Sequence, residues 1–220
     1  AGIVINADTG EIDLSASAVN TYVITYTVRG KACTQSVEIT ASFTNTYSMN
    51  FDGVDDYFTV PSFTTSGDDL TISFWFKDGG GSGSQYILSG DANNVVYHPS
   101  NTVFYAKING TLAYIQTDSG GVPAILDGNW HHIAITKTGS TVTWWFDGGS
   151  YTTLGGGTTG GFTLLNIGAY ITPSSYVDAN LDELAIWNSD QTSNMATIYN
   201  SGEPGNLTSL SPLKWWRMGD

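Results

Sequence analysis

The chain has 220 residues, of which 40% are hydrophobic, 13% aromatic and 12% charged, a composition far from that of disordered proteins and sufficient to bury a sizeable core. Its 20 acidic and 7 basic residues give a net charge of −13, which repels phosphate and disfavours nucleic acid binding. The single cysteine, Cys33, excludes an internal disulfide and a thiol-rich metal site, and no apolar run approaches the length of a membrane span.

The first 44 residues carry the signals of short strands. YVITYTVRGKACTQSVEITASF (22–43) holds two runs rich in Thr, Val, Ile and Tyr around the turn-like RGKA, which predicts a long β-hairpin. Upstream, GIVI and EIDL flank NADTG, a second turn signal. Four strands are fewer than the roughly seven of an immunoglobulin-type sandwich, so we expect the missing strands upstream of residue 1.

From residue 45 onward, strand-like segments recur at short intervals between clusters of Gly, Ser, Asp and Asn. The segments are SMNFDG, YFTVP, LTISFWFK, QYILSG, NVVYHP, TVFYAKING, TLAYIQT, NWHHIAITK, STVTWWFDG, FTLLNIG, LDELAIWN and LKWWRMGD. So many strands require a two-sheet sandwich or a barrel. NMATIYN predicts one short helix, capped by Thr192 or Ser193 and stopped by Gly202.

The two adjacent histidines lie in NWHHIAITK, where a period of two places His131 on one face of the strand and His132 on the other. A metal pair or a proton relay would need both on one side, so we expect structural roles for both. In the next strand, Val142, Trp144 and Phe146 share one face. Trp145 then lies on the opposite face as an outward platform, and Asp147-Gly148-Gly149 predicts a hairpin turn.

The order of these motifs resembles a known family. FDGVDDYFTVP, LTISFWFK, DGNWHHIAITKTGSTVTWWFDGG, LDELAIWN, a short helix and LKWWRMGD together resemble a laminin-G-like domain of the concanavalin A-like lectin and glucanase superfamily, akin to the pentraxins, over residues 46–220. The resemblance implies an all-β, antiparallel two-sheet jelly-roll sandwich with one short helix. TGEIDLSAS followed by NTYVITYTVRG resembles the last strands of immunoglobulin-like or cadherin-like surface repeats.

We therefore predict a partial immunoglobulin-like β unit at 1–44 and a jelly-roll domain at 45–220, in which KWWRM returns beside SMNF. The ending IYNSGEPGNLTSLSPLKWWRMGD, with the preceding β-repeat, is similar to structural and tail-associated proteins of marine bacteriophages.

Clustered acids point to turn formation or to calcium, which prefers carboxylate and carbonyl oxygens. Asp52, Asp55 and Asp56 form one candidate group, and Asp91 with Asn93 forms another. Pentraxin-like members hold calcium with acids and amides from two loops, and Asp91, Asn93 and Asn94 match the first of these. The segment NIGAYITPSS, where the second loop is expected, has no carboxylate before Asp178, so a single Ca²⁺ is the most that the resemblance implies. Asp182 and Glu183 are expected to be structural.

Catalytic signals are absent from the sequence. Glucanases of this fold carry E-x-D-x-x-E on one strand, and the nearest string, EIDLSA at 11–16, lacks the second glutamate. No G-x-S-x-G, H-E-x-x-H or Walker motif occurs. We therefore do not expect an enzyme.

Sugar recognition needs flat aromatic faces and amide or carboxylate groups, and loops carrying Tyr, Trp and Asn supply both. The candidates for carbohydrate binding are Asn93, Asn94, Tyr97, Trp145, Tyr170 and Tyr176. For each tyrosine the alternative is that it covers a sheet edge. The predicted function is a non-catalytic carbohydrate-binding and adhesion module of a phage virion or an extracellular surface, with surface glycans and neighbouring subunits as partners. The alternatives are a purely structural assembly module and, less favoured, a polysaccharide-degrading enzyme.

Overall fold

A computed structural model describes residues 3–5, 12, 20–28, 31–39, 45–100, 102–152, 154–155 and 159–218. The chain divides into two compact units, Ala1–Thr44 and Asn45–Asp220. No helix in the described part of the chain is long and apolar enough to span a bilayer.

The first unit contains a hairpin of β1 (Asn20–Val28) and β2 (Lys31–Ile39). The strands pair antiparallel from Asn20 opposite Ile39 to Val28 opposite Lys31, which confirms the predicted hairpin. Ile5 and Ile12 form an isolated antiparallel bridge on either side of the predicted NADTG turn, whose own residues lie outside the described ones. That this unit is the end of an immunoglobulin-like repeat stays a prediction.

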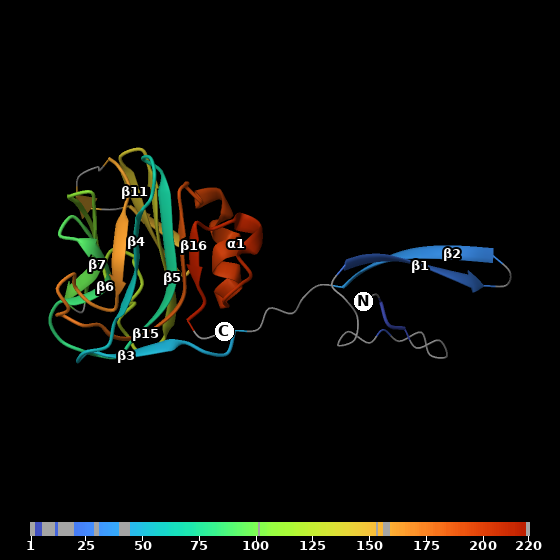
Figure 1. Cartoon of the computed structure of the whole chain (residues 1–220), viewed down its shortest axis with the longest axis horizontal. Coiled ribbons are helices and arrows are strands. Elements are labelled where there is room, and N and C mark those ends of the chain that lie inside the picture. The colour runs from blue at the N-terminus through green and yellow to red at the C-terminus, as the bar shows by residue number, and fades with distance from the viewer. Residues whose placement is uncertain are drawn as a thin grey trace. The chain divides into compact units, whose positions relative to one another are not determined.

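The second unit is a sandwich of two antiparallel seven-stranded sheets in the described residues (Figure 1). The first sheet has the order β12-β11-β10-β5-β15-β16, with β3 also paired to β15. Its strands are β3 (Met49–Asp52), β5 (Leu70–Asp78), β10 (Trp130–Thr138), β11 (Thr141–Phe146), β12 (Gly149–Thr152), β15 (Asp178–Trp187) and β16 (Lys214–Trp216).

The second sheet has the order β13-β9-β8-β7-β6-β14-β4. Its strands are β4 (Phe58–Thr64), β6 (Gln85–Asp91), β7 (Asn94–Ser100), β8 (Val103–Ile108), β9 (Thr111–Gln116), β13 (Leu154–Gly155) and β14 (Thr163–Ile167). Each strand-like segment of the sequence contains one of these strands, and the predicted jelly-roll sandwich is confirmed. The short β12 and β13 were not predicted, because they lie in a glycine-rich stretch without strand periodicity.

The closure of the first sheet differs from the expected one. β3 pairs with β15 at Asp178 to Leu181, and β16 pairs with β15 at Leu184 to Ile186. The first and last strands therefore lie end to end along one edge of β15 and are not each other's partners. Glu183 separates the two contacts at a bulge in β15, with φ of +50°.

The main core lies between the two sheets, and side-chain alternation decides which residues enter it. Ile133, Ile135, Val142, Trp144 and Phe146 are buried in this core, which confirms the faces predicted for β10 and β11. The hairpin that joins β11 to β12 turns at Asp147 and Gly148, both at positive φ, and this confirms the predicted turn.

A second, smaller core lies on the outer face of the first sheet. The C-terminal segment packs there, with α1 (Met195–Tyr199) on the side of β5 and β16 away from β6 and β7 (Figure 1). The same segment contains three short 3₁₀ helices, Thr192–Asn194, Asn200–Gly202 and Thr208–Leu210. This second core is made of Ala134, Ala185, Trp187, Met195, Ile198 and Leu207.

The ends of α1 differ from the prediction. Asn194 is its N-cap residue and makes no side-chain capping hydrogen bond. Thr192, which was expected to cap the helix, lies in the preceding 3₁₀ helix. There its hydroxyl donates to Asp190 Oδ1 at 2.6 Å. At the other end, Asn200 stops the helix in the left-handed conformation, two residues before the expected Gly202.

Candidate functional site

A row of five tyrosines crosses the outer face of the second sheet. Tyr86, Tyr97, Tyr105 and Tyr114 stand opposite one another on β6, β7, β8 and β9. Their ring centroids are 4.6, 5.2 and 5.4 Å apart in that order, and Tyr170 lies 4.7 Å from Tyr86 at the end of the row. We call these five residues the tyrosine row.

Three rings of the row, those of Tyr86, Tyr97 and Tyr105, cover one another's faces. The planes of Tyr86 and Tyr97 differ by only 6° and those of Tyr97 and Tyr105 by 17°, so the rings stand stacked side by side. Because side chains stand roughly perpendicular to a sheet, stacked rings present their edges and hydroxyls outward, and their faces are not open platforms. The row therefore offers about one phenol group for each strand it crosses.

The phenols of Tyr86 and Tyr97 stay protonated at neutral pH. Burial raises the pKa of Tyr86 above its ordinary value, with a further rise from Tyr170, and burial likewise raises the pKa of Tyr97, with further rises from Tyr86 and Tyr105. A neutral phenol can both donate and accept a hydrogen bond, as the hydroxyl groups of a sugar require.

The loop after β14 connects the tyrosine row with an acidic turn. Tyr170 starts this loop against Tyr86, and the loop carbonyl of Ser175 accepts the Tyr86 N–H at 3.0 Å. Tyr176, at the other end of the loop, lies 6.2 Å from Tyr57 between ring centroids. Since Tyr57 follows Asp56 directly, the row and the acidic turn belong to one end of the domain.

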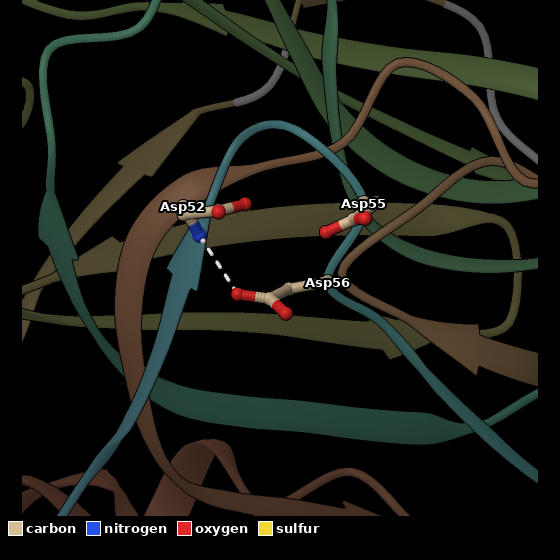
Figure 2. Close-up of side chains that lie close together, drawn as sticks. All are labelled: Asp52, Asp55 and Asp56. Atoms are coloured by element: carbon tan, nitrogen blue, oxygen red, sulfur yellow. Dashed lines mark hydrogen bonds between the residues drawn. The ribbon is translucent and has the colours of Figure 1, made fainter.

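The acidic turn contains Asp52, which ends β3, and Asp55 and Asp56, which follow it; all three are exposed (Figure 2). Each offers a carboxylate oxygen within 4.8 Å of the others. Asp52 Oδ1 accepts the Val54 N–H at 2.8 Å, and Asp56 Oδ2 accepts the Asp52 N–H at 3.2 Å. The acids therefore form the turn, as one of the two sequence interpretations predicted, and they also converge.

The donor set of this turn fits calcium in chemistry. Ca²⁺ takes about six to eight oxygen ligands, often carboxylates of mixed denticity and loop carbonyls. Three converging carboxylates supply three to six of these, and the two turn hydrogen bonds each engage one oxygen of a carboxylate. Asp52, Asp55 and Asp56 are the residues that would hold the ion.

The other predicted ligand group lies at the opposite end of the strands. Gln85 Oε1, at the start of β6, accepts the N–H of Asp178, which stands opposite Asp52 in the β3–β15 pair. Asp91 ends β6 six residues later, about 20 Å along an extended strand. The two acidic groups therefore cannot share an ion.

The turn between β6 and β7 uses its polar groups internally. Asp91 accepts the Asn93 N–H at 2.7 Å and the Asn94 side-chain amide at 3.0 and 3.1 Å. Asn94 is buried, and its Oδ1 accepts the Asn109 N–H at 3.0 Å. Asp91, Asn93 and Asn94 thus shape this turn, while Tyr97, Tyr170 and Tyr176 lie in or beside the tyrosine row.

Trp145 points away from the main core, as its strand position predicted, but the C-terminal segment packs against it. It is partly buried beside the second core, and its Nε1 donates to Thr136 Oγ1 at 2.9 Å. Both sheets and the main core between them therefore separate Trp145 from the tyrosine row.

The two histidines of β10 face opposite sides, as predicted. His131 Nδ1 lies 2.8 Å from Asp147 Oδ2 and its Nε2 lies 3.0 Å from Asp127 Oδ1, so both ring nitrogens are engaged. The hydrogen bond with Asp147 is the main reason why the pKa of His131 is raised. His132 is buried with Ser73 Oγ 2.8 Å from its Nε2, and burial lowers its pKa to about 4.

Sequence reasoning missed Tyr86, Tyr105 and Tyr114. A signal for two of them exists, because Tyr105 and Tyr114 lie at equal distances from the Asn109-Gly110 turn that sets the β8–β9 register. The alignment of Tyr86 with Tyr97, and of this pair with Tyr105, depends on register shifts in β6–β7 and β7–β8 that no local motif announces. The string EIDLSA lies outside the described residues, apart from Ile12.

Comparison with known proteins places this geometry in a family. A family model described as the concanavalin A-like lectin/glucanases superfamily matches residues 52–195. The chain belongs to the concanavalin A-like lectin/glucanase superfamily. This agrees with the resemblance drawn from the order of the motifs, and both parts of the candidate site lie on the superfamily's sandwich.

Several solved structures are similar to this chain at low sequence identity. A Bacteroides ovatus protein provisionally named a carbohydrate-binding protein is 13% identical, with a TM-score of 0.56, over 94% of this chain and 63% of its own length. A heptameric pentraxin from Limulus polyphemus is 17% identical, with a TM-score of 0.44, over 68% of this chain and 80% of its own. Domains LG4-5 of mouse laminin α1 are 17% identical, with a TM-score of 0.46, over 70% and 43%. No curated protein sequence matches the chain.

Proposed function

We propose that this chain is a non-catalytic carbohydrate-binding and adhesion module, displayed on a phage particle or another extracellular surface, that attaches to surface glycans through the tyrosine row. The observation that carries the proposal is the row itself. It gives a line of phenol hydroxyl groups on a superfamily sandwich, and one strand spacing is close to the length of one sugar unit in an extended chain.

The charge of the chain favours neutral glycans as the partners. With a net charge of −13, the surface repels strongly anionic polymers. A neutral polysaccharide lying across the strands would exchange its water for hydrogen bonds to successive phenols. Such contacts are individually weak, so useful attachment needs many copies of the module and an avidity gain of roughly 10²- to 10⁴-fold.

Calcium at the acidic turn is part of this proposal. Asp52, Asp55 and Asp56 would hold one Ca²⁺ next to Tyr57 and Tyr176, at the end of the domain where the tyrosine row begins. When bound, the ion supplies a hard cation that attracts hydroxyl oxygens. The residues themselves shape the turn and keep the carboxylates converged.

The test compares multivalent display of the full chain with a triple variant, Tyr86→Phe, Tyr97→Phe and Tyr105→Phe, on neutral cell-surface polysaccharides. These substitutions remove only the hydroxyls and preserve the stacked rings. We expect avid binding by the wild type and a loss of about tenfold or more in the variant, because each lost hydrogen bond costs about 0.5–1.5 kcal/mol. Tyr151→Phe, outside the row, is the matched control and should bind normally.

The alternative function, a structural assembly module, uses the same surface differently. Tyrosine is enriched at protein interfaces, and a half-buried row could pack against a neighbouring subunit. A wild type that binds no glycan when displayed multivalently, but forms a defined oligomer with other particle proteins, would support assembly and overturn the lectin proposal.

A further inference from the structure

A cavity of about 290 Å³ opens on the outer face of the first sheet, beside the second core. Trp75 on β5 and Asp182 on β15 are its most buried lining residues, at 6% and 4% exposure. Trp130, at the start of β10, is 40% exposed. Residues 45–48, with Gly202 and Pro204 after α1, complete the lining.

We propose that this cavity binds a single terminal sugar of a neutral glycan, as a second binding site in addition to the tyrosine row. The inference rests on the proposed carbohydrate-binding function and specifies that the cavity binds the end of a glycan. The cavity volume is at the lower limit of ligand pockets in proteins, which suits one sugar ring and not an extended chain.

Aromatic surface in this cavity is open to a ligand, unlike that of the tyrosine row. Trp130 is 40% exposed and Tyr47 is 66% exposed. The C–H face of a sugar ring packs on such open aromatic surface. Trp75 is already covered, since its ring stacks on Tyr199 at 6.1 Å and lies 5.3 Å from His132, and it contributes a fixed base.

Polar groups on the same face supply hydrogen bonds for hydroxyls. Asp182 Oδ1 accepts the Glu183 N–H at 2.7 Å, which fixes the direction of this buried carboxylate. Ser48 lines the cavity, and Asn180 shares the face of Asp182, two residues away on β15. The Asn180 amide reaches Ser48 Oγ only at 3.4 Å, a long contact that a sugar hydroxyl could replace.

This mixture of groups discriminates between ligand classes. A purely apolar ligand would displace water from the polar groups that line the cavity, such as Ser48, without replacing its hydrogen bonds, which is costly. An anionic sugar would meet both that carboxylate and the net charge of −13. A neutral sugar, with one apolar face and hydroxyl donors at its rim, satisfies both the indole and the carboxylate.

The cavity wall is fixed before any ligand binds. Asn45 Nδ2 donates to Glu183 Oε1 at 2.7 Å, and this bond holds the segment that carries Tyr47 and Ser48 against β15. A wall held in this way loses little conformational entropy on binding.

The experiment titrates the full chain with the methyl glycosides of glucose, galactose, mannose and N-acetylglucosamine, and with glucuronic acid as the anionic comparison. Tryptophan fluorescence and the indole N–H resonance of Trp130 report binding. The variants are Trp130→Ala and Tyr47→Ala, both at exposed positions. Leu213→Ala is the matched control, because Leu213 is 42% exposed and lies outside both proposed sites.

We expect at least one neutral glycoside to shift the Trp130 resonance, and glucuronic acid to leave it unchanged. Trp130→Ala should weaken that binding about tenfold, the equivalent of about 1.4 kcal/mol, while Leu213→Ala leaves it intact. The inference is overturned if no neutral glycoside binds, or if binding survives in both Trp130→Ala and Tyr47→Ala.

The same proteins, displayed multivalently on polysaccharide, separate this inference from the proposed function. One outcome is that polysaccharide binding needs the phenols of the tyrosine row but no glycoside binds in the cavity. This outcome supports the proposed function and contradicts the second binding site. Absence of binding in both assays overturns both.

Discussion

The two outer faces of the sandwich treat aromatic side chains in opposite ways. On the second sheet, the rings of Tyr86, Tyr97 and Tyr105 in the tyrosine row stack on one another and turn their edges and hydroxyls outward. On the first sheet, the C-terminal segment packs against Trp187 and Trp145 and leaves Trp130 open at its margin. The comparison shows that an aromatic residue on a strand becomes a platform only where neither a neighbouring ring nor another segment covers its face.

The C-terminal segment covers the outer face of the first sheet and ends in β16, which pairs with β15. Removal of the end of this segment should have the largest effect. A chain ending at residue 209 lacks β16 and the residues after it. Trp216 of β16 and the following Met218 pack on the main core, and the loss of β16 exposes an edge of β15. We expect no cooperative thermal unfolding of the second unit in calorimetry. A chain that lacks only residues 219–220 is the control, and a cooperative melt of the shorter chain near the full-length temperature would contradict the expectation.

Glu183 on β15 binds residues of the C-terminal segment and the segment before β3. Its buried carboxylate accepts hydrogen bonds from Asn45 Nδ2 and Trp215 Nε1 and lies 3.6 Å from Arg217 Nε. Glu183→Ala should lower the free energy of unfolding by about 3 kcal/mol, because hydrogen bonds to a charged group are lost together. Chemical denaturation measures the change. The matched control, Glu203→Ala at an exposed site, should change it by less than about 0.5 kcal/mol, and equal effects would contradict the role of Glu183.

Acid should loosen both cores, since each holds a buried histidine. Burial lowers the pKa of His132, in contact with Trp75 and Tyr199 on the outer face of the first sheet, and of His98, beside Phe76 and Phe104 in the main core, to about 4 in each case. Between pH 6.5 and 4 the unfolded chain binds more protons at these sites than the folded chain. The stability that they contribute is therefore complete above pH 6.5 and falls as the pH decreases toward 4.

The expected loss across this window is on the order of 3 kcal/mol for each histidine. His131 acts in the opposite direction, because its pKa is raised and its contribution is lost as the pH increases. Denaturation curves at several pH values measure the slope, and His98→Leu should reduce it by about half relative to wild type. A slope that His98→Leu does not change would show that this buried imidazole is not the group that titrates.

Calcium should give the smallest effect, at the end of the domain where the tyrosine row begins. At ten times its dissociation constant, Ca²⁺ would add about 1.4 kcal/mol of stability, or about 3–6 °C in melting temperature. Asp55→Asn should remove this increment while leaving intact the turn hydrogen bonds that Asp52 and Asp56 accept. Glu203→Gln removes the same charge elsewhere and should keep the calcium response. An identical melt with calcium and with chelator would leave the acids as turn formers.

The sequence predicted most of the sandwich because strand signals are local. Alternation in β10 and β11 placed Ile133 and Trp144 in the main core and turned His131 and His132 apart, as the structure has them. The Asp147-Gly148 turn was equally readable, since glycine and aspartate adopt the positive φ that it requires. The partners of β15 could not be predicted from the sequence. β3 and β16 pair with the same edge of β15, on either side of the bulge at Glu183.

The candidate surfaces were predicted less well, and the reason is geometric. Tyr97, Tyr170 and Tyr176 were singled out by residue type, but register shifts align Tyr97 with Tyr86 and Tyr105, and a loop brings Tyr170 to the row. Trp130 belongs to a strand signal in the sequence and Tyr47 directly precedes one. They became part of a proposed sugar site only because the C-terminal segment does not cover them. Composition, alternation and turn residues thus determined the fold class and the inward faces. Tertiary packing alone decided which outward aromatic groups stack together, which are covered and which stay open, since these outcomes depend on contacts between residues far apart in the chain.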